Sequence, residues 1–152
     1  MGGQPIKSGK LNQLLDRYLR AFGPATAADF AAWSGLPVGP LKQRFGREQL
    51  DAPDAPLPDP ETPAPIRFLP AYDNLLLAHA DRSRILPAGA KPSGLIGQPT
   101  VLVDGFVAAT WRLSDGELTI SPLHKLQPRD RREVKLEANE LARFLAAKRV
   151  LL

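Results

Sequence analysis

The densest group of chemically capable side chains lies between residues 73 and 84. It combines carboxylates, an amide, an imidazole and guanidinium groups, namely Asp73, Asn74, His79, Asp81, Arg82 and Arg84. Because the group surrounds the apolar run 75–78, we expect some members to be partly buried, and buried charges need partners. Asp81 has Arg84 within reach along the chain, as Asp73 has Arg82. Three interpretations follow: structural ion pairs, acid–base catalysis, or a polar site that faces nucleic acid and comprises Asp73, Asn74, His79 and Asp81.

Metal and nucleophile chemistry find little support in the sequence. His79 and Asp81 are close, but His124 lies 45 positions beyond His79 and the chain has no cysteine. A zinc site needs three or four converging donors. Neither Ser83 nor Ser93 lies in the Gly-x-Ser-x-Gly context of a nucleophile elbow. We therefore expect no metal and no cofactor, and these motifs identify no catalytic residue.

The net charge of +4 is distributed unevenly along the 152 residues. Residues 1–50 carry seven Lys and Arg against three acids, whereas residues 51–80 carry one against five. Residues 129–152 again carry seven cations, against four acids. Two basic ends thus flank an acidic middle, and a polyanion such as DNA is expected to bind at the ends.

No segment has the composition of a membrane span or a secretory signal. The apolar runs 75–78 and 101–103 are far shorter than the roughly 20 residues of a spanning helix. The first seven residues have no apolar stretch after their charge, unlike a secretory signal. A chain without cysteine also fits a reducing compartment. We expect a cytoplasmic protein without a membrane partner, associated with the nucleoid if it binds DNA.

The first fifty residues predict a helix-turn-helix unit. Apolar residues from 11 to 22 recur at helical spacing and form one continuous stripe. Thr26 and Asp29 have the spacing of a capping box and predict a second helix over residues 27–33. Gly35 is the residue type that tolerates the left-handed turn after a helix. A third, short helix is expected near residues 39–45, and a single strand near residues 47–51.

The third helix carries the expected DNA contacts. Arg and Gln side chains read base edges, while Lys mostly contacts phosphate. The residues on or just after this helix that fit these roles are Lys42, Gln43, Arg44 and Arg47. A solvated helix face is the alternative interpretation of the same four residues.

The remainder predicts an α+β arrangement. Residues 53–65 contain six prolines, which exclude helix and central strand and indicate an extended connector. Residues 66–69 predict a strand, and residues 72–80 either a short helix or a turn-rich segment. The Asp104-Gly105 pair predicts a two-residue hairpin turn between strands 101–103 and 106–113. A second turn at 114–117 leads to a strand at 118–120, which completes an antiparallel meander.

A charged helix is expected over residues 129–147. Its first turns contain Arg129, Arg131, Arg132 and Lys135, at the helix end where the macrodipole favours acids, which suggests contact with an anion. Arg132, with Arg82 and Arg84, therefore joins the expected DNA contacts. The apolar side of this helix is expected to comprise Val134, Ala138, Leu141, Phe144 and Leu145. Three aromatic residues in apolar patterns, Trp33, Phe106 and Trp111, are expected in the core.

The fold expected from these patterns is a winged-helix (helix-turn-helix) unit followed by a small antiparallel β-meander and a C-terminal helix. Its parts are a winged-helix unit at residues 8–52, a proline-rich connector at 53–65, and the meander with its closing helix at 66–152. We expect the last part to pack on the first.

Several blocks of sequence resemble one bacterial winged-helix family. They are RYLRAFGPATAADFAAWSGL at 17–36, FLPAYDNLLL at 68–77, HADR at 79–82 and PTVLVDGFV at 99–107. Some members of this family are DNA glycosylases that unhook interstrand crosslinks, the AlkZ-like group. The resemblance covers residues 11–145 and implies a winged-helix fold, a link to DNA repair and double-stranded DNA as partner.

The chain departs from the glycosylases of this family in its wing, and also in its length and catalytic signature. A winged helix has two strands and a loop after its third helix, but the segment between Lys42 and Leu50 has room for one strand. Those enzymes are longer, with tandem winged-helix units, and this chain resembles their C-terminal portion. Their catalytic signature is a pair of glutamines on either side of one aliphatic residue, and none of the six glutamines here forms such a triplet. Three functions stay open: a DNA-binding module without its own catalysis, a glycosylase whose catalytic residues lie outside this chain, and a protein-interaction module. The sequence does not set the oligomeric state.

Overall fold

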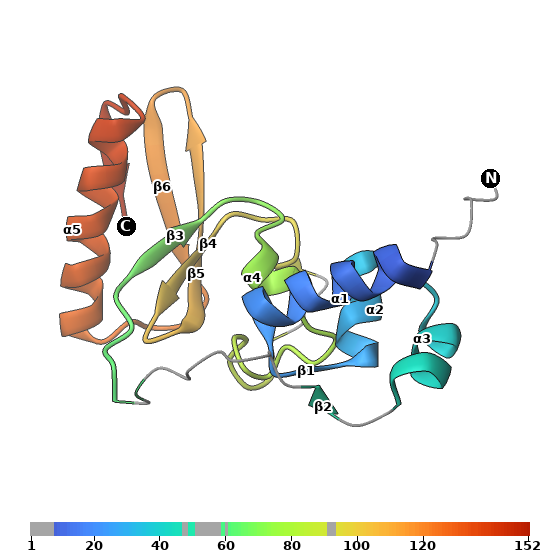
Figure 1. Cartoon of the computed structure of the whole chain (residues 1–152). Coiled ribbons are helices and arrows are strands. Elements are labelled where there is room, and N and C mark those ends of the chain that lie inside the picture. The colour runs from blue at the N-terminus through green and yellow to red at the C-terminus, as the bar shows by residue number, and fades with distance from the viewer. Residues whose placement is uncertain (1–7, 47–48, 51–58, 60, 91–93) are drawn as a thin grey trace. The chain divides into compact units, whose positions relative to one another are not determined.

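A computed structural model of the chain describes residues 8–46, 49–50, 59, 61–90 and 94–152 (Figure 1). The chain divides into two compact units. Unit 1 comprises Met1–Asp59 with Leu77–Asp81, and unit 2 comprises Pro60–Leu76 with Arg82–Leu152. Neither unit is one continuous stretch of chain. Most of the expected proline-rich connector lies outside the described residues.

The helix α1 (Ser8–Phe22) confirms the apolar stripe predicted for the first helix. Its Leu15, Tyr18 and Leu19 are buried in the core of unit 1. The Tyr18 ring lies with its centroid 5.2 Å from those of Phe30 and Trp33. Aromatic pairs at such distances contribute about 0.5–1.5 kcal/mol each beyond their burial. These tilted aromatic pairs therefore help to fix α1 against the second helix.

The turn between the next two helices is built as the sequence predicted. The helix α2 (Ala27–Ser34) ends at Gly35, whose φ of 71° is the left-handed conformation that glycine adopts without strain. The helix α3 (Val38–Phe45) follows and buries Leu41 against the same core. Unit 1 also contains a small sheet, in which β1 (Ala25–Thr26) pairs antiparallel with β2 (Gln49–Leu50). The strand β1 was not predicted, because its two residues were assigned only to the helix cap.

Unit 2 contains a five-stranded sheet of β3 (Arg67–Leu69), β4 (Thr100–Val103), β5 (Phe106–Ser114), β6 (Glu117–Pro122) and β7 (Arg149–Leu151) in that order. The predicted hairpin turns are confirmed: Asp104 and Gly105 have φ of 49° and 78°, and Asp115 and Gly116 have 54° and 78°. Two consecutive positive φ values are typical of the type I′ turn that joins twisted strands. The predicted antiparallel meander is confirmed in β4, β5 and β6. The strand β7 was not predicted, and it pairs parallel to β6, so the complete sheet is mixed.

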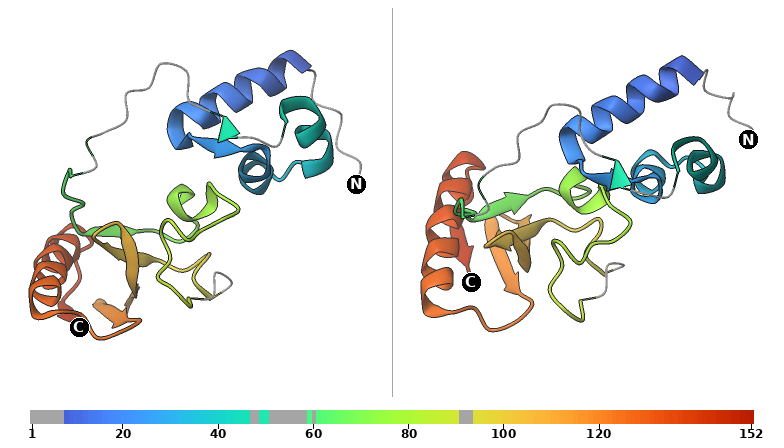
Figure 2. Two further views of the ribbon diagram at one scale, coloured as in Figure 1. Left: turned by 90° about the horizontal axis from the view of Figure 1, so that it is seen from below. Right: turned by 60° about the horizontal axis from the view of Figure 1, so that its bottom comes forward.

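The two faces of this sheet bury separate apolar clusters. On one face α5 (Pro128–Phe144) places Val134, Ala138 and Ala142 against the strands (Figures 1 and 2). On the other face the short helix α4 (Asn74–Leu77) and the segment that follows it contribute Leu76, Ile85, Leu86 and Leu95. The alternation of Val101 and Leu102 along β4 sends one side chain into each cluster. Residues 72–80, left open between helix and turns, thus contain both.

Two aromatic residues are exposed against expectation: Phe144, expected on the apolar side of the last helix, and Phe106, expected in the core. Phe144 is 85% exposed because it follows Ala142 by two residues, a rotation of about 200° from the buried face of α5. Phe106 is 45% exposed because it precedes the buried Val107 and so points to the opposite side of β5. Trp33 and Trp111 are half-buried, and the Trp111 indole N–H donates to the Leu69 carbonyl at 2.9 Å.

Thr100 at the start of β4 provides a test of this packing. Its side chain is fully buried, and its hydroxyl oxygen has no hydrogen-bond partner among the described residues. Replacement by valine, which keeps the shape and removes the hydroxyl, should stabilise the protein by about 1–2 kcal/mol. Denaturant unfolding measures the change. The facing Thr110 is only partly buried, so Thr110→Val should change stability little; a loss of stability in Thr100→Val would contradict the assignment.

Candidate nucleic-acid interface

The exposed face of α3 presents an amide between two cations. Leu41 is buried, and Gln43 lies two residues further on, about 200° around the helix and therefore pointing away from the core. Lys42 and Arg44 lie about 100° to either side of Gln43. All three side chains are exposed. The structure thus brings together three of the predicted DNA contacts, while the fourth, Arg47, lies outside the described residues.

Arg44 is held in a defined position by its neighbours. The side-chain oxygen of Asn12 on α1 accepts hydrogen bonds from its Nε and Nη2 at 3.3 and 2.9 Å. Its guanidinium carbon also lies 5.5 Å from the centre of the Phe45 ring, within the range of a cation–π contact. An ordered arginine loses less rotamer entropy when it binds a phosphate or a base. The sequence had not indicated the contribution of Asn12.

The predicted contacts Arg82 and Arg84 differ in their exposure. Arg82 is half-buried, and its Nε donates to the Leu76 carbonyl of α4 at 2.8 Å. Arg84 is exposed. Both residues belong to unit 2, whereas α3 belongs to unit 1.

The polar group expected at residues 73–81 is divided between the units. Asp73 belongs to unit 2, where its carboxylate accepts from the Leu75 N–H at 2.8 Å and caps α4. Asn74 is the exposed first residue of α4. His79 and Asp81 belong to unit 1, the first half-buried and the second exposed. The described contacts therefore assign Asp73 a capping role and place His79 in a different environment.

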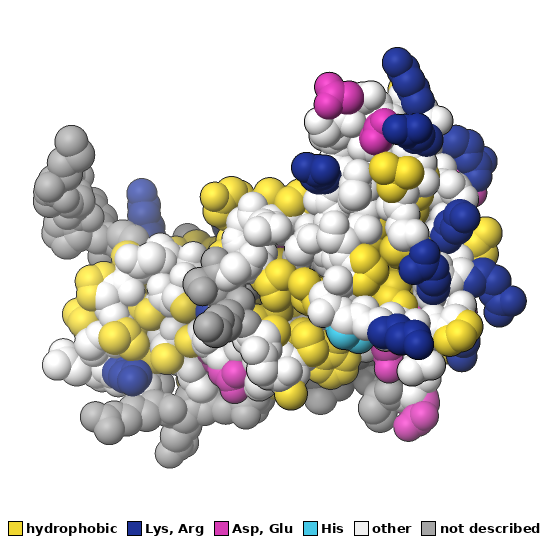
Figure 3. All heavy atoms as spheres, turned by 180° about the vertical axis from the view of Figure 1, so that it is seen from behind, with side chains coloured by type: hydrophobic (Ala, Val, Ile, Leu, Met, Phe, Trp, Pro, Cys, Tyr) yellow, Lys and Arg dark blue, Asp and Glu magenta, His cyan; other side chains and the backbone are white. Residues whose placement is uncertain are grey.

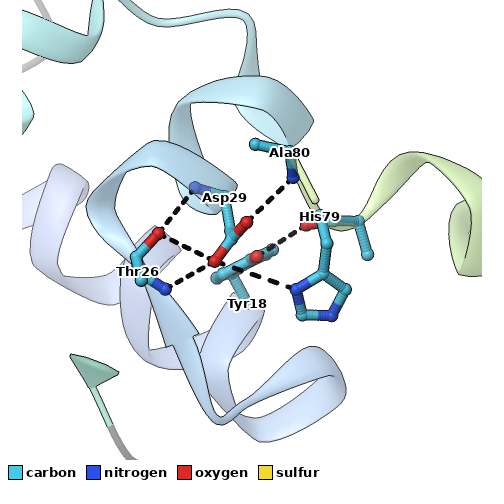
Figure 4. A network of polar contacts seen from close by, with 6 residues as sticks. Tyr18, Thr26, Asp29, His79 and Ala80 are labelled. Atoms are coloured by element: carbon cyan, nitrogen blue, oxygen red, sulfur yellow. Dashed lines mark hydrogen bonds and ion pairs between the residues drawn. The ribbon is translucent and has the colours of Figure 1, made fainter. Parts of the chain in front are cut away.

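That environment is a buried hydrogen-bond network around Asp29 (Figure 4). One oxygen of the Asp29 carboxylate accepts from the N–H and the hydroxyl of Thr26, both at 2.8 Å, which completes the predicted capping box. The other oxygen accepts from the backbone N–H of Ala80 at 2.8 Å. His79 Nδ1 lies 3.9 Å from the first oxygen. Asp29 thus fixes the start of α2 and also holds residues 79 and 80.

Tyr18 reinforces the same connection. Its hydroxyl donates to the carbonyl of Ala78 at 2.6 Å, and both residues are buried (Figure 4). The segment Leu77–Asp81, here called the returning segment, is therefore bound to unit 1 through Tyr18 and Asp29. The capping box was visible in the sequence, but these two contacts join residues about fifty to sixty positions apart and left no signal in local spacing.

Opposing effects act on the pKa of Asp29. Burial alone would raise the pKa, since it penalises the charged carboxylate. The hydrogen bonds from Thr26 and from the Ala80 N–H, together with the nearby His79 side chain, favour the charged form and outweigh burial. The net result is a pKa below the ordinary value of 3.8.

The helix α5 separates its side chains into three faces. Val134, Ala138 and Ala142 form the buried face. Glu133, Glu137 and Glu140 follow one another at steps of three and four and share a second face. The third face is basic and contains the expected DNA contact Arg132, and Figure 3 shows Lys and Arg gathered on the part of unit 2 that carries α5.

The basic face also forms a groove of about 490 Å³, which is lined by Pro128, Arg131, Arg132, Lys135, Leu136 and Asn139. Arg131 donates to the backbone oxygen of Leu152 at 2.5 Å. On the acidic side, Arg129 pairs with Glu133 at 2.9 Å, and Arg143 pairs with Glu140. The groove therefore concentrates Arg132 and Lys135 on one side of α5, away from the helix's own acids.

In the described part of the chain, no three His, Asp or Glu side chains converge as metal ligands. No helix there is long and apolar enough to cross a membrane.

A protein-family model described as 'DNA glycosylase AlkZ-like' matches residues 7–144. This chain belongs to the AlkZ-like DNA glycosylase family. The solved structure of the DNA glycosylase AlkZ from Streptomyces sahachiroi is similar to this AlkZ-like chain, with a TM-score of 0.71 and 24% sequence identity. The match covers 99% of this chain and 47% of that protein, so the chain spans about half the length of its solved relative and shares its fold. No curated protein matches the chain.

Replacement of Asp29 by asparagine tests the network and its charge. The substitution removes one acceptor and the charge, so it should lower the free energy of unfolding at neutral pH by about 2–3 kcal/mol. Because the pKa is lowered in the folded state, the charged form contributes stability above pH 3.8 and loses it as the pH falls through the folded pKa. The difference between wild type and Asp29→Asn, measured by urea unfolding at several pH values, should therefore shrink in acid. A difference that grows in acid would contradict the sign of the shift.

Proposed function

We propose that this chain is a DNA-binding module of the AlkZ-like family, in which unit 1 is a winged helix and α3 contacts duplex DNA. The exposed face of α3, with Gln43 between Lys42 and Arg44, is the observation that carries the proposal. The order α1, β1, α2, α3, β2, with β1 antiparallel to β2, supports a winged helix. A DNA partner would place the chain in the cytoplasm of a bacterium, with the nucleoid.

The dimensions of α3 fit this role. An α-helix with its side chains is about 10–12 Å across, which fits the roughly 12 Å width of the major groove, and the eight residues of α3 make a helix about 12 Å long. Gln43 at the centre of the exposed face is placed to present its amide to an adenine edge. Lys42 and Arg44 on either side are placed to contact the phosphates that border the groove. The hydrogen bonds from Asn12 hold Arg44 ready for this contact.

The basic face of α5 is proposed as a second phosphate-binding surface. Arg132 and Lys135 are exposed there and line one groove, and the acids of the same helix lie on another face. This separation leaves a local positive potential, to which a polyanion responds. Arg82 and Arg84 are proposed as supporting contacts from the same unit.

The chain is proposed to supply DNA grip and not base release. The family's glutamine triplet does not occur among its six glutamines. Asp73 accepts from the Leu75 N–H and caps α4, and Asp29 accepts from the Ala80 N–H and holds the returning segment. No acid–base role is assigned to the polar residues at 73–81.

The salt dependence of duplex binding tests the α3 contact. Each phosphate contact releases counterions and contributes about −0.9 to the slope of log affinity against log salt, so about four contacts give a slope of −3 to −4. Lys42→Ala with Arg44→Ala should reduce the magnitude of this slope by about two. Duplex titrations by fluorescence anisotropy at several salt concentrations measure it.

Two further double variants separate local contact from net charge. Arg17→Ala with Arg20→Ala removes the same charge from exposed positions on α1 and should leave the slope nearly unchanged. Arg132→Ala with Lys135→Ala should reduce the slope if α5 binds the same duplex. Absence of binding at low salt, or equal effects of the α1 and α3 variants, would leave a protein-interaction role as the better interpretation.

The catalytic part of the proposal is tested by base release. The purified chain, incubated with alkylated or crosslinked duplex under conditions in which it binds, should produce no abasic sites above the protein-free reaction. Strand cleavage at abasic sites by alkali, followed by electrophoresis, reports the product. Release that depends on the protein and disappears in His79→Ala would overturn this assignment.

A further inference from the structure

One exposed aromatic ring is held in place by an unusual backbone. Tyr72 lies between β3 and α4 in unit 2, and the residue is 69% exposed. Its φ is 58°, in the left-handed region that bulky residues rarely adopt because Cβ approaches the carbonyl oxygen. Strained conformations of this kind concentrate at functional sites, since the surrounding structure must maintain them.

Gly97 forms the surface on which the ring lies. A Cβ atom at Gly97 would be 3.1 Å from both Cε1 and Cζ of Tyr72 and 3.3 Å from its hydroxyl oxygen. No point within the plane of the ring lies at these nearly equal distances from three adjacent atoms, so the Gly97 backbone approaches the face of the ring. Gly97 itself has a φ of 106°, a conformation open essentially to glycine. Only glycine therefore meets both demands at this position.

The opposite face of the ring is left for solvent. Tyr72 is 69% exposed although Gly97 lies against one face of its ring, so the exposed area of the ring is on the opposite face and the edges. The next residue, Asp73, caps α4 and so fixes the backbone on which Tyr72 is mounted. A flat aromatic surface that is already ordered on one side loses little entropy when a second flat group stacks on it.

We propose that Tyr72 is a stacking platform for an unpaired nucleobase of DNA. Every base has a π-face, and stacking on an aromatic side chain needs no particular sequence. An unpaired base suits a single open ring, because a paired base is already covered on both faces by its neighbours in the helix. The proposal rests on the proposed function, since it assumes that the chain binds DNA.

The probes are a short duplex that carries one unpaired 2-aminopurine and the same duplex fully paired. The wild-type chain should prefer the first and quench its fluorescence by stacking. Tyr72→Ala should reduce the preference about tenfold, as expected for one base–aromatic stack, while Tyr72→Phe should retain it. Gly97→Ala should weaken the preference in the same direction as Tyr72→Ala but by less, because a Cβ 3.1 Å from two ring atoms shifts the ring by a few tenths of an ångström. Phe144→Ala, at an aromatic residue 85% exposed on α5, is the matched control and should have no effect.

Tyr72→Gly distinguishes ligand binding from folding. It removes the ring and relieves the left-handed backbone, so the preference should disappear while the Tm stays the same or rises. Equal preferences in wild type and Tyr72→Ala would overturn the platform. If the paired duplex shows salt-dependent binding in that case, the proposed function survives, whereas loss of binding to both probes in the wild type refutes both proposals.

Discussion

Asp29 is a buried carboxylate at the first turn of α2, and both of its oxygens must be satisfied because an unpaired buried charge is costly. Thr26 satisfies one oxygen from within the helix cap, and Ala80 satisfies the other from far along the chain. The first contact determines where α2 begins. The position of α3 depends in turn on α2, through the short turn at Gly35. The surface proposed to contact DNA is thus oriented by the buried carboxylate of Asp29, which is not itself part of that surface.

Features that arise from local spacing could be predicted from the sequence. The apolar stripe of α1, the Thr26–Asp29 capping box and the Asp104-Gly105 hairpin each depend on residues a few positions apart, and all are present. The parallel strand β7 could not be predicted, since three residues at the end of a helix carry little strand signal by themselves. They become a strand because α5 returns the chain alongside β6, where Gly116 accepts from Lys148 at 2.6 Å and β7 then pairs with the strand.

The site shows the same division. Exposure of Lys42, Gln43 and Arg44 follows from the period of one helix, and the sequence sufficed to find them. The group at residues 73–81 looked like one cluster because its members are close in sequence, but the chain sends Asp73 and His79 into different units. The left-handed backbone of Tyr72 could not be predicted from the sequence. A positive φ at a bulky residue is imposed by tertiary structure, and no residue preference indicates it.

The interleaving of the two units limits how the protein can be dissected. A fragment that ends within the proline-rich stretch would contain α1, α2 and α3 but lack the returning segment Leu77–Asp81. It would leave the Tyr18 hydroxyl and one oxygen of Asp29 without the partners that they have in the intact chain. Conversely, a fragment that begins at that stretch would carry a five-residue piece of the other unit's interior on its surface, including the buried Ala78. A fragment boundary chosen by sequence order alone would therefore separate unit 1 from residues that stabilise it. A recombinant helix-turn-helix fragment would need Leu77–Asp81 attached through a linker to keep the contacts described here.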